Sequence, residues 1–210
     1  MRALVVYCHP RRGSFTEAVR DVILDKLEAA GAEIRLRDLY AEGFNPVLSS
    51  HEHEIYEDET VNQDPVQSHC DDLKWCDTLI FVYPTWWYGL PAMIKGWLDR
   101  AMVPGVAFVM PDEQNSDIRP GLTNIARMGV FTTCGASRWL TFLVGAPGKR
   151  TLMRGVRLLC GKGCRTTFAA HYLMDSSTTE SRARHLANVA AKMDRFIGRA
   201  TPRTQKDATA

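Results

Sequence analysis

The strongest constraint on the fold is an apolar run that leads directly into an aromatic turn and then a helix. Residues 78–83 are apolar apart from Thr78 and have the length of a buried strand. Pro91 suits a first helical turn, where its missing N–H costs nothing. The turn between them carries three aromatic residues and a glycine, namely Trp86, Trp87, Tyr88 and Gly89. Because open α/β sheets bind ligands at the carboxyl ends of their parallel strands, this turn is a candidate binding site.

Strand and helix patterns alternate along the rest of the chain. Strands are predicted over residues 3–7, 32–39, 78–83, 126–133 and 165–171, and helices over 19–30, 65–76, 91–102 and 180–199. This alternation indicates an α/β fold with a doubly wound, five-stranded parallel sheet, and the strand count fits the order 2-1-3-4-5. We expect a single domain over residues 1–200. The polar tail at 201–210 lacks periodicity and is expected to be disordered.

Composition limits the classes of partner. The net charge of +2 gives no reason to expect nucleic acid as a partner. No apolar stretch approaches the ~18 residues that span a bilayer, so we expect no membrane insertion. The first strand is followed by His-Pro-Arg-Arg and no cleavage pattern, so no signal peptide is predicted and a cytoplasmic protein is expected. In that compartment the six cysteines are expected to be free thiols.

Three other segments carry polar or metal-ligating residues, and the longest of them is of the kind that often forms a functional or interface loop. Residues 40–64 are predicted to be a long loop without regular structure, and His51 and His53 within it are interpreted as exposed residues. Cys160 and Cys164 lack a second ligand pair at zinc spacing, so no metal site is predicted. The basic cluster between Lys149 and Arg165 is interpreted as a solvated helix face.

Three loops are predicted to open on one edge of the sheet. The first, residues 9–16, carries His9, Ser14 and Thr16 ahead of a helix, where free N–H groups favour a phosphate. The second, residues 84–90, offers aromatic walls with backbone donors. The third, residues 132–138, presents two hydroxyl groups and a glycine. Together these features suit a flavin nucleotide, a planar heterocycle with polar edges and a phosphate.

Each loop alone has a simpler interpretation. Ser14 or Thr16 could only cap a helix, and the aromatic residues could belong to a core or an interface. A phosphate loop after the first strand also suggests a Cys-x5-Arg phosphatase. However, the sixth residue after Cys8 is Ser14, so the required arginine is absent from that position. A P-loop sequence is absent as well.

Several segments resemble the NAD(P)H:quinone oxidoreductases of the DT-diaphorase type. The resemblance runs over residues 3–135 and more faintly to about 197, and residues 89–97 are its most specific part. The segments that carry it are the first strand with His9, Ser14–Thr16, Asp38–Tyr40, Phe44–Pro46, Pro84–Arg100 and Thr132–Gly135.

The resemblance implies a flavodoxin-like homodimer with a flavin site near the subunit interface. It implies hydride transfer from NADH or NADPH, and two-electron reduction of quinones or of nitro- and azo-aromatic compounds. On this resemblance we expect FAD as the cofactor, with FMN as the alternative. The cofactor's phosphate and ribitol would lie against His9, Ser14, Phe15 and Thr16. Its ring would lie against Pro84, Thr85, Trp86, Trp87, Tyr88, Gly89, Thr132, Thr133, Cys134 and Gly135, with Arg184 near the adenine half of FAD.

The chain departs from the resemblance at the proton donor. The family usually has Gly-Gly after the paired threonines, whereas this chain has Cys134-Gly135. The Tyr and His that shuttle protons in mammalian members have no counterpart in residues 136–148. Tyr88 is the candidate donor instead, and Arg138 is the candidate for stabilising negative charge on the flavin edge. We expect ping-pong turnover, with nicotinamide and aromatic acceptor using one pocket in turn.

Two other functions remain open. The chain could be a flavin-bearing regulatory subunit that docks on another protein, such as a potassium efflux channel, through residues 44–69. It could also be an electron carrier like flavodoxin. Such carriers are usually strongly acidic, so the net charge of +2 speaks against that function.

Overall fold

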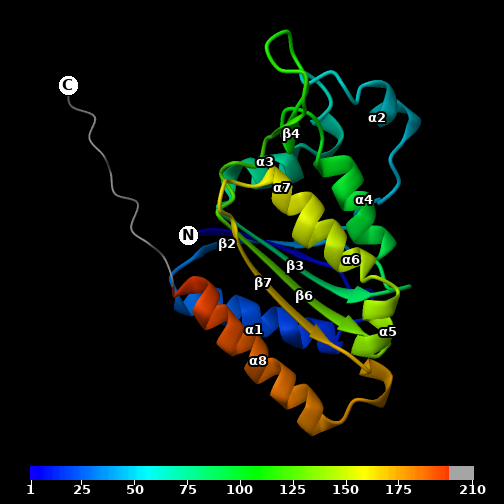
Figure 1. Cartoon of the computed structure of the whole chain (residues 1–210), viewed down its shortest axis with the longest axis vertical. Helices are drawn as coiled ribbons and strands as arrows, with labels where there is room; N and C mark the ends of the chain where they lie inside the picture. Colours follow the sequence, from blue (N-terminus) through cyan, green and yellow to red (C-terminus); the bar gives the residue numbers. More distant parts are fainter. Residues whose placement is uncertain (199–210) are drawn as a thin grey trace, which may run out of the picture.

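Five parallel strands form the centre of the protein, in the order β2-β1-β3-β6-β7 (Figure 1). The computed structural model describes residues 1–198, so the predicted tail at 201–210 lies outside the described residues. The strands are β1 (Arg2–Tyr7), β2 (Glu33–Asp38), β3 (Thr78–Thr85), β6 (Arg127–Cys134) and β7 (Arg165–His171). Numbered among themselves, these strands have the order 2-1-3-4-5, which confirms the predicted topology.

Helices cover both faces of this sheet (Figure 1). On one face lie α1 (Phe15–Ala29) and α8 (Thr179–Ile197). On the other lie α3 (Gln67–Trp75), α4 (Ala92–Ala101) and a continuous helical segment at 147–159. Side chains alternate between the faces: Val5 packs with α1 and α8, whereas Leu4 and Val6 pack with α3 and α4. The central strands therefore read as apolar runs because both of their faces are buried.

The segment after β6 is helical, whereas the sequence analysis predicted only a solvated basic helix face within it, without bounds. It contains α5 (Arg138–Leu143), α6 (Pro147–Arg150), a π-helical stretch η2 (Thr151–Val156) and α7 (Arg157–Leu159). Leu152 and Val156 are buried against the sheet, while the basic side chains Lys149, Arg150 and Arg154 are exposed. Part of the predicted solvated basic helix face is therefore present on this segment.

The prediction that residues 40–64 lack regular structure was wrong. They contain α2 (Ser50–Glu54), and the 3-10 helix η1 (Asp64–Val66) follows. A capping box between Ser49 and Glu52 starts α2, and Glu52 also pairs with Arg100 of α4 over 2.5 Å. His51 and His53 are exposed on α2, as expected. The Ser-x-x-Glu spacing was the available signal for this helix.

Smaller differences concern element ends and one hairpin. Pro91 has an extended conformation, and α4 begins one residue later, at Ala92. The stretch expected to be irregular between α4 and β6 contains two short antiparallel strands, β4 (Phe108–Val109) and β5 (Arg119–Pro120). Within residues 1–198, no helix is both long and apolar enough to cross a membrane.

Gly96 allows the chain after β2 to lie directly on α4. A Cβ atom at Gly96 would lie 2.0 Å from the Pro46 carbonyl oxygen, far inside van der Waals contact. Gly155, on the helical segment over the same face, has no heavy atom within 4 Å of the same position. The two glycines therefore form a matched pair, one required by packing and one not.

We predict opposite effects of alanine at these two positions. Gly96→Ala should lower the free energy of unfolding by about 1–3 kcal/mol, because the overpacked methyl group must displace backbone. Gly155→Ala should be neutral or raise it by up to about 1 kcal/mol, the ordinary helix-propensity gain. Urea unfolding measures both values. Equal effects of the two substitutions would contradict the close approach of Pro46 to α4.

Candidate active site

The register between β3 and β6 brings two of the predicted loops together. Tyr83 pairs with Thr132, Pro84 with Thr133 and Thr85 with Cys134, so both strands end at the same level. The Thr85 and Thr132 hydroxyl oxygens are hydrogen-bonded at 2.8 Å. The turns that leave these strands, at 86–89 and 135–137, therefore start side by side.

A second pair of hydroxyl groups connects the first loop to β6. The Thr16 hydroxyl, at the start of α1, is hydrogen-bonded to the Thr133 hydroxyl at 2.9 Å, and both residues are buried. The loops after β1, β3 and β6 thus meet at one point on the carboxyl edge of the sheet. The prediction that they share one edge is confirmed.

These loops enclose a cleft of about 680 Å³, within the usual range for small-molecule sites. Its lining residues come from four segments of the chain. They are His9, Pro84, Thr85, Trp86, Trp87, Tyr88, Thr133, Cys134, Gly135, Ala136, Leu140, Met174 and Asp175. One wall is aromatic, and the opposite side offers hydroxyl and backbone groups.

The aromatic wall is a tight turn held in a strained conformation. Trp87 and Tyr88 have φ values of 48° and 60°, and the Gly89 N–H donates to the Trp86 carbonyl oxygen at 2.9 Å. Two successive positive φ values are the signature of a type I′ turn, here without the glycine or asparagine that usually adopts it. Strain of this kind persists only where surrounding structure holds it, and it clusters at ligand sites. The Trp87 side chain is 94% exposed.

Gly148 supports this turn from behind. A Cβ atom at Gly148 would lie 2.8 Å from the Gly89 carbonyl carbon, so α6 approaches the turn backbone to backbone. Helix α6 therefore fixes the position of the aromatic wall.

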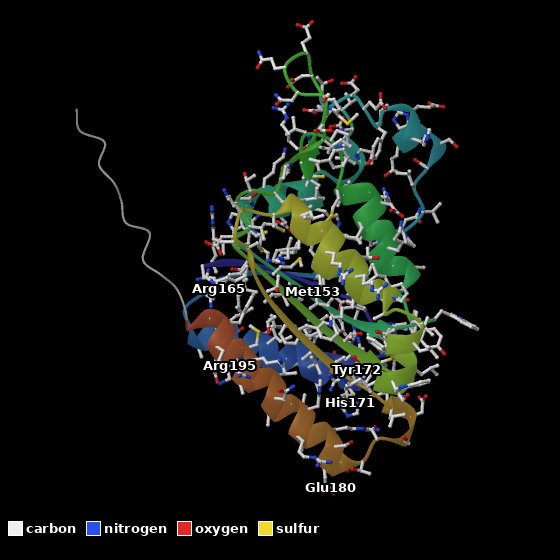
Figure 2. All side chains as sticks on the ribbon, in the orientation of Figure 1. Met153, Arg165, His171, Tyr172, Glu180 and Arg195 are labelled. Carbon is white, nitrogen blue, oxygen red and sulfur yellow. The ribbon has the colours of Figure 1, made fainter. Side chains whose placement is uncertain are left out.

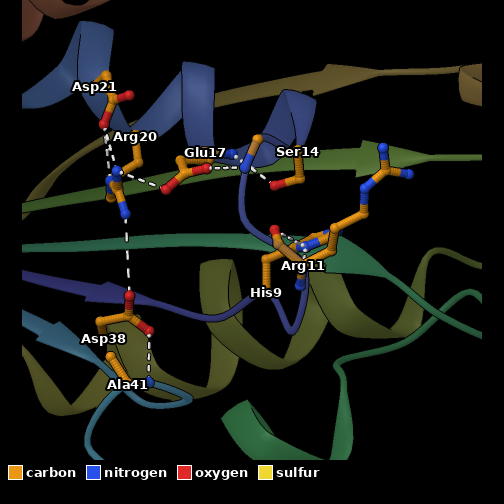
Figure 3. A network of polar contacts seen from close by, with 9 residues as sticks. His9, Arg11, Ser14, Glu17, Arg20, Asp21, Asp38 and Ala41 are labelled. Carbon is orange, nitrogen blue, oxygen red and sulfur yellow. Dashed lines mark hydrogen bonds and ion pairs between the residues drawn. The ribbon is translucent and has the colours of Figure 1, made fainter.

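The first loop presents the N-terminus of α1 (Figure 3). Ser14 caps the helix and accepts a hydrogen bond from the Glu17 N–H at 3.1 Å. The N–H groups of Phe15 and Thr16 open the helix and have no intrahelical acceptor, which suits an anion. The Glu17 carboxylate accepts from the Gly13 N–H, and that hydrogen bond lowers the pKa of Glu17. A phosphate at this loop would compete with Glu17 for the same donor.

Not every predicted site residue lines the cleft. Ser14, Phe15, Thr16 and Thr132 are absent from the lining, although Thr16 and Thr132 are hydrogen-bonded to the lining residues Thr133 and Thr85. Phe15 packs against His171 and His185, with ring centroids 5.1 and 5.9 Å apart. Gly89 forms the turn without lining the cleft. Arg184 is exposed on α8 and is absent from the lining.

Arg138 lies outside the lining as well. It is exposed at the start of α5, and its charge acts on the phenol of Tyr172. Burial raises the pKa of Tyr172, and Arg138 opposes that rise. Figure 2 shows Tyr172 and His171 at the carboxyl end of β7. Tyr172 also lines a small cavity of about 20 Å³ behind the aromatic turn, together with Tyr88 and Lys149. That volume is enough for about one water molecule.

The sequence analysis missed the fourth segment of the cleft. The loop after β7 contains the 3-10 helix η3 (Met174–Ser176), and it places Met174 and Asp175 in the lining. Asp175 lies over Gly135, where a Cβ atom would be 2.7 Å from a carboxylate oxygen. The rule that located the other loops also applies to the fifth strand and would have found this one.

Nucleophilic chemistry at the first loop is disfavoured by the burial of Cys8. The side chain is fully buried, and burial raises the pKa of its thiol to about 12. A thiolate nucleophile is therefore not formed near neutral pH. Among residues 1–198, no three His, Cys, Asp or Glu side chains gather in a metal-binding group. The cleft thus offers an aromatic wall at Trp86–Tyr88 and polar groups at Thr133–Gly135, and the Thr16–Thr133 hydrogen bond joins it to the N-terminus of α1.

Comparison with known proteins agrees with this architecture. A family described by its flavodoxin-like fold matches residues 1–194. The chain is 31% identical over 164 residues to an uncharacterized NAD(P)H oxidoreductase of Haemophilus influenzae, covering 77% of this chain and 79% of that protein. It is 30% identical over 157 residues to ribosyldihydronicotinamide dehydrogenase (quinone) of Pongo abelii, covering 67% and 66% respectively.

Solved structures show the same fold at lower identity. An NAD(P)H:quinone oxidoreductase from Methanothermobacter marburgensis superposes with a TM-score of 0.77 at 23% identity, covering 92% of this chain and 97% of that one. An FMN-dependent NADH-azoreductase from Bacillus anthracis, in complex with FMN, superposes with a TM-score of 0.75 at 16% identity, covering 94% and 100%. The chain therefore belongs to the family of proteins with this flavodoxin-like fold.

Proposed function

We propose that the protein is a flavin-dependent NAD(P)H oxidoreductase that reduces quinones or related aromatic acceptors such as azo compounds. The observation that carries the proposal is the cleft of about 680 Å³ with an aromatic wall and hydroxyl edges, joined to the N-terminus of α1 by the Thr16–Thr133 hydrogen bond. The relatives named as NAD(P)H oxidoreductase and as quinone dehydrogenase support the same chemistry.

The residues divide the work of binding. The α1 N-terminus with His9 and Ser14–Thr16 holds the phosphate, because its N–H groups and helix dipole favour an anion. Thr133 and Gly135 face the polar edge of the ring, and Trp86–Tyr88 cover its apolar surface. Flavin, when bound, supplies two-electron transfer between a nicotinamide and an aromatic acceptor. The chain positions both partners and excludes water from the aromatic side.

Donor and acceptor use the same space in turn. The aromatic turn offers flat surfaces, and each stacking contact contributes about 0.5–1.5 kcal/mol to binding a planar ring. Nicotinamides, quinones and azo compounds are all flat, so one wall accepts each of them. Turnover is therefore ping-pong, and NAD(P)H and acceptor compete for the free cleft.

Two flavins, FAD and FMN, are candidates for the cofactor. The resemblance favours FAD, whereas the azoreductase structure contains FMN. Arg184, the residue expected near the adenine half of FAD, lies outside the cleft lining. We propose FAD with FMN as the alternative, and the flavin released from purified protein by denaturation distinguishes them on chromatography.

The protein is proposed to act as a homodimer with the flavin site near the interface. Large apolar side chains are exposed on the turn at the cleft and on α5, an arrangement that isolated monomers rarely show. They are Trp87 (94% exposed), Trp139 (69%), Leu140 (36%), Phe142 (77%), Leu143 (63%) and Val144 (46%). A second copy that covers this surface would close the open side of the cleft.

A reducing compartment fits the state of the cysteines. All six are free and buried, and no pair among them forms a disulfide. Free thiols persist where glutathione and thioredoxin keep them reduced. We therefore propose that the protein works in the cytoplasm, where NADH and NADPH are available.

One prediction concerns the donor of the proton that the reduced acceptor needs. Tyr88→Phe should lower kcat with a quinone by about 10²-fold or more, the usual contribution of a general acid, while KM changes little. The measurement is steady-state kinetics with NADPH and a benzoquinone. Tyr56→Phe, a change outside the cleft lining, is the matched control and should keep full turnover.

Arg138→Gln tests the second candidate role in the same assay. It should lower kcat by removing positive charge beside Tyr172 and the α5 end of the cleft. Unchanged kcat in either variant would exclude the corresponding role. Intersecting double-reciprocal lines, in place of parallel ones, would contradict ping-pong turnover with a shared cleft.

Another prediction concerns the proposed dimer. Phe142→Asp places a charge in the apolar surface and should shift the protein from dimer to monomer, with loss of flavin. Ile118→Asp changes a residue that is 58% exposed beside the distant β4–β5 hairpin and should leave the dimer intact. Light scattering after size-exclusion chromatography measures both. A wild-type protein that is monomeric at micromolar concentration would overturn the proposed dimer.

A further inference from the structure

A pair of cysteines lies at the end of the sheet opposite to the cleft. Cys160 ends α7 and Cys164 precedes β7, and a short turn joins them. The Cys164 N–H donates to the Gly161 carbonyl oxygen at 2.8 Å, which closes the turn. Figure 2 labels Arg165 at the start of β7, at this end of the molecule, and Tyr172 at the other end of the strand.

The turn is fixed by its surroundings on both sides. Cys160 forms a parallel bridge with Leu122, and the Gly161 N–H donates to the Ile125 carbonyl oxygen at 3.0 Å. A Cβ atom at Gly161 would lie 2.6 Å from the Thr123 carbonyl oxygen, so only glycine fits there. The backbone that carries both cysteines is therefore held in place by the fold.

Both cysteines line the same hollow, together with Arg157. The Cys160 thiol donates to the Val156 carbonyl oxygen at 3.4 Å, and the Arg157 Nε–H donates to the Cys164 carbonyl oxygen at 3.4 Å. A hydrogen bond with Cys160 lowers the pKa of Cys164, burial opposes the change, and the nearby Arg157 guanidinium adds to the lowering. The positive charge of Arg157 beside Cys164 therefore favours the thiolate of this residue.

The remaining cysteines differ in this respect. Burial raises the pKa of Cys70 to about 11, and that of Cys8 and Cys76 to about 12. Cys134 has no sulfur contact and is hydrogen-bonded to the Thr141 hydroxyl at 3.7 Å. Because the thiolate is the reactive form, Cys164 is the chemically distinct thiol of this chain.

Two hollows reach Cys164 from outside. One, of about 410 Å³, is lined by Cys164 with Arg157, Lys192 and Arg195, and the other, of about 390 Å³, is lined by both cysteines. Cys164 itself is only 3% exposed. The hollows beside Cys164, combined with its slight exposure, admit a small reagent and exclude a protein partner.

We propose that Cys160 and Cys164 form a peroxide-reactive pair that closes to a disulfide. The Cys164 thiolate attacks one oxygen of a hydroperoxide, the O–O bond breaks, and the other oxygen leaves as water or an alcohol after taking a proton. Cys164 is then a sulfenic acid. The Cys160 sulfur attacks it, the S–O bond breaks, and the hydroxyl group leaves with the Cys160 proton as water. The two thiols lose two electrons, which reduce the peroxide.

The position of Lys162 makes the disulfide simple to detect. Trypsin cleaves after Arg157, Lys162 and Arg165, which places the two cysteines in separate peptides, 158–162 and 163–165. The full-length protein is treated with hydrogen peroxide, its remaining thiols are alkylated under denaturing conditions, and the digest is analysed by mass spectrometry. We expect one joined peptide that a dithiol reductant separates again.

Single substitutions assign the two roles. In Cys160→Ser, Cys164 should stop at the sulfenic acid and react with dimedone, whereas in Cys164→Ser, Cys160 should stay reduced. Cys70→Ser is the matched control and should still give the joined peptide. Arg157→Gln should slow its formation several-fold, because loss of the guanidinium charge raises the pKa of Cys164 and reduces its thiolate fraction.

The proposal fails if peptides 158–162 and 163–165 remain separate while peroxide oxidises other cysteines. It also fails if Cys164 in Cys160→Ser forms sulfenic acid no faster than Cys70 does. Both readouts are independent of flavin binding and of turnover. They therefore test this proposal separately from the proposed oxidoreductase activity.

Discussion

The hydrogen-bonded register between β3 and β6 sets the positions of the two turns on which the cleft depends. Because Thr85 lies opposite Cys134, the aromatic turn and the turn at Gly135 leave the sheet at the same height. A slip of one residue would reverse the face on which every side chain of a strand lies. The buried alternation of both strands therefore protects the geometry of the site as well as the core.

Hydrogen bonds between threonine hydroxyl groups connect the loops of the site to one another. Thr132 bonds to Thr85 and Thr133 bonds to Thr16, so neighbouring residues of β6 tie the sheet to two different loops. Backbone contact completes the arrangement, because Gly148 allows α6 to lie against the strained turn at Trp87 and Tyr88. The chain thus holds an exposed aromatic wall rigidly, which reduces the entropy lost when a flat ligand binds.

Much of the fold was predictable from local pattern. The five apolar runs and the helices around Val19 and Val189 gave the sheet order, because alternating strands and helices have few allowed topologies. For the helical segment at 147–159 only a basic helix face was predicted, without bounds, because its short pieces carry a π-helical stretch and no side-chain cap at Ala146. The α2 helix was missed although Ser49 and Glu52 have capping-box spacing. In the site, most lining residues of three loops were predicted, whereas Ala136, Leu140 and Asp175 were not. Asp175 was missed because the rule for strand ends was not applied to the loop after β7. The exposure of Arg138 and Arg184 likewise depends on helix orientation, which spacing alone does not give.

The central claim is that the cleft binds a flavin that NAD(P)H reduces. The visible absorption spectrum of the purified protein, supplied with FAD or FMN and then treated with NADPH without oxygen, tests this claim most directly. The account predicts that one flavin remains bound through gel filtration and that NADPH bleaches its absorbance completely. A flavin that stays oxidised, or a protein that retains neither flavin, would contradict it.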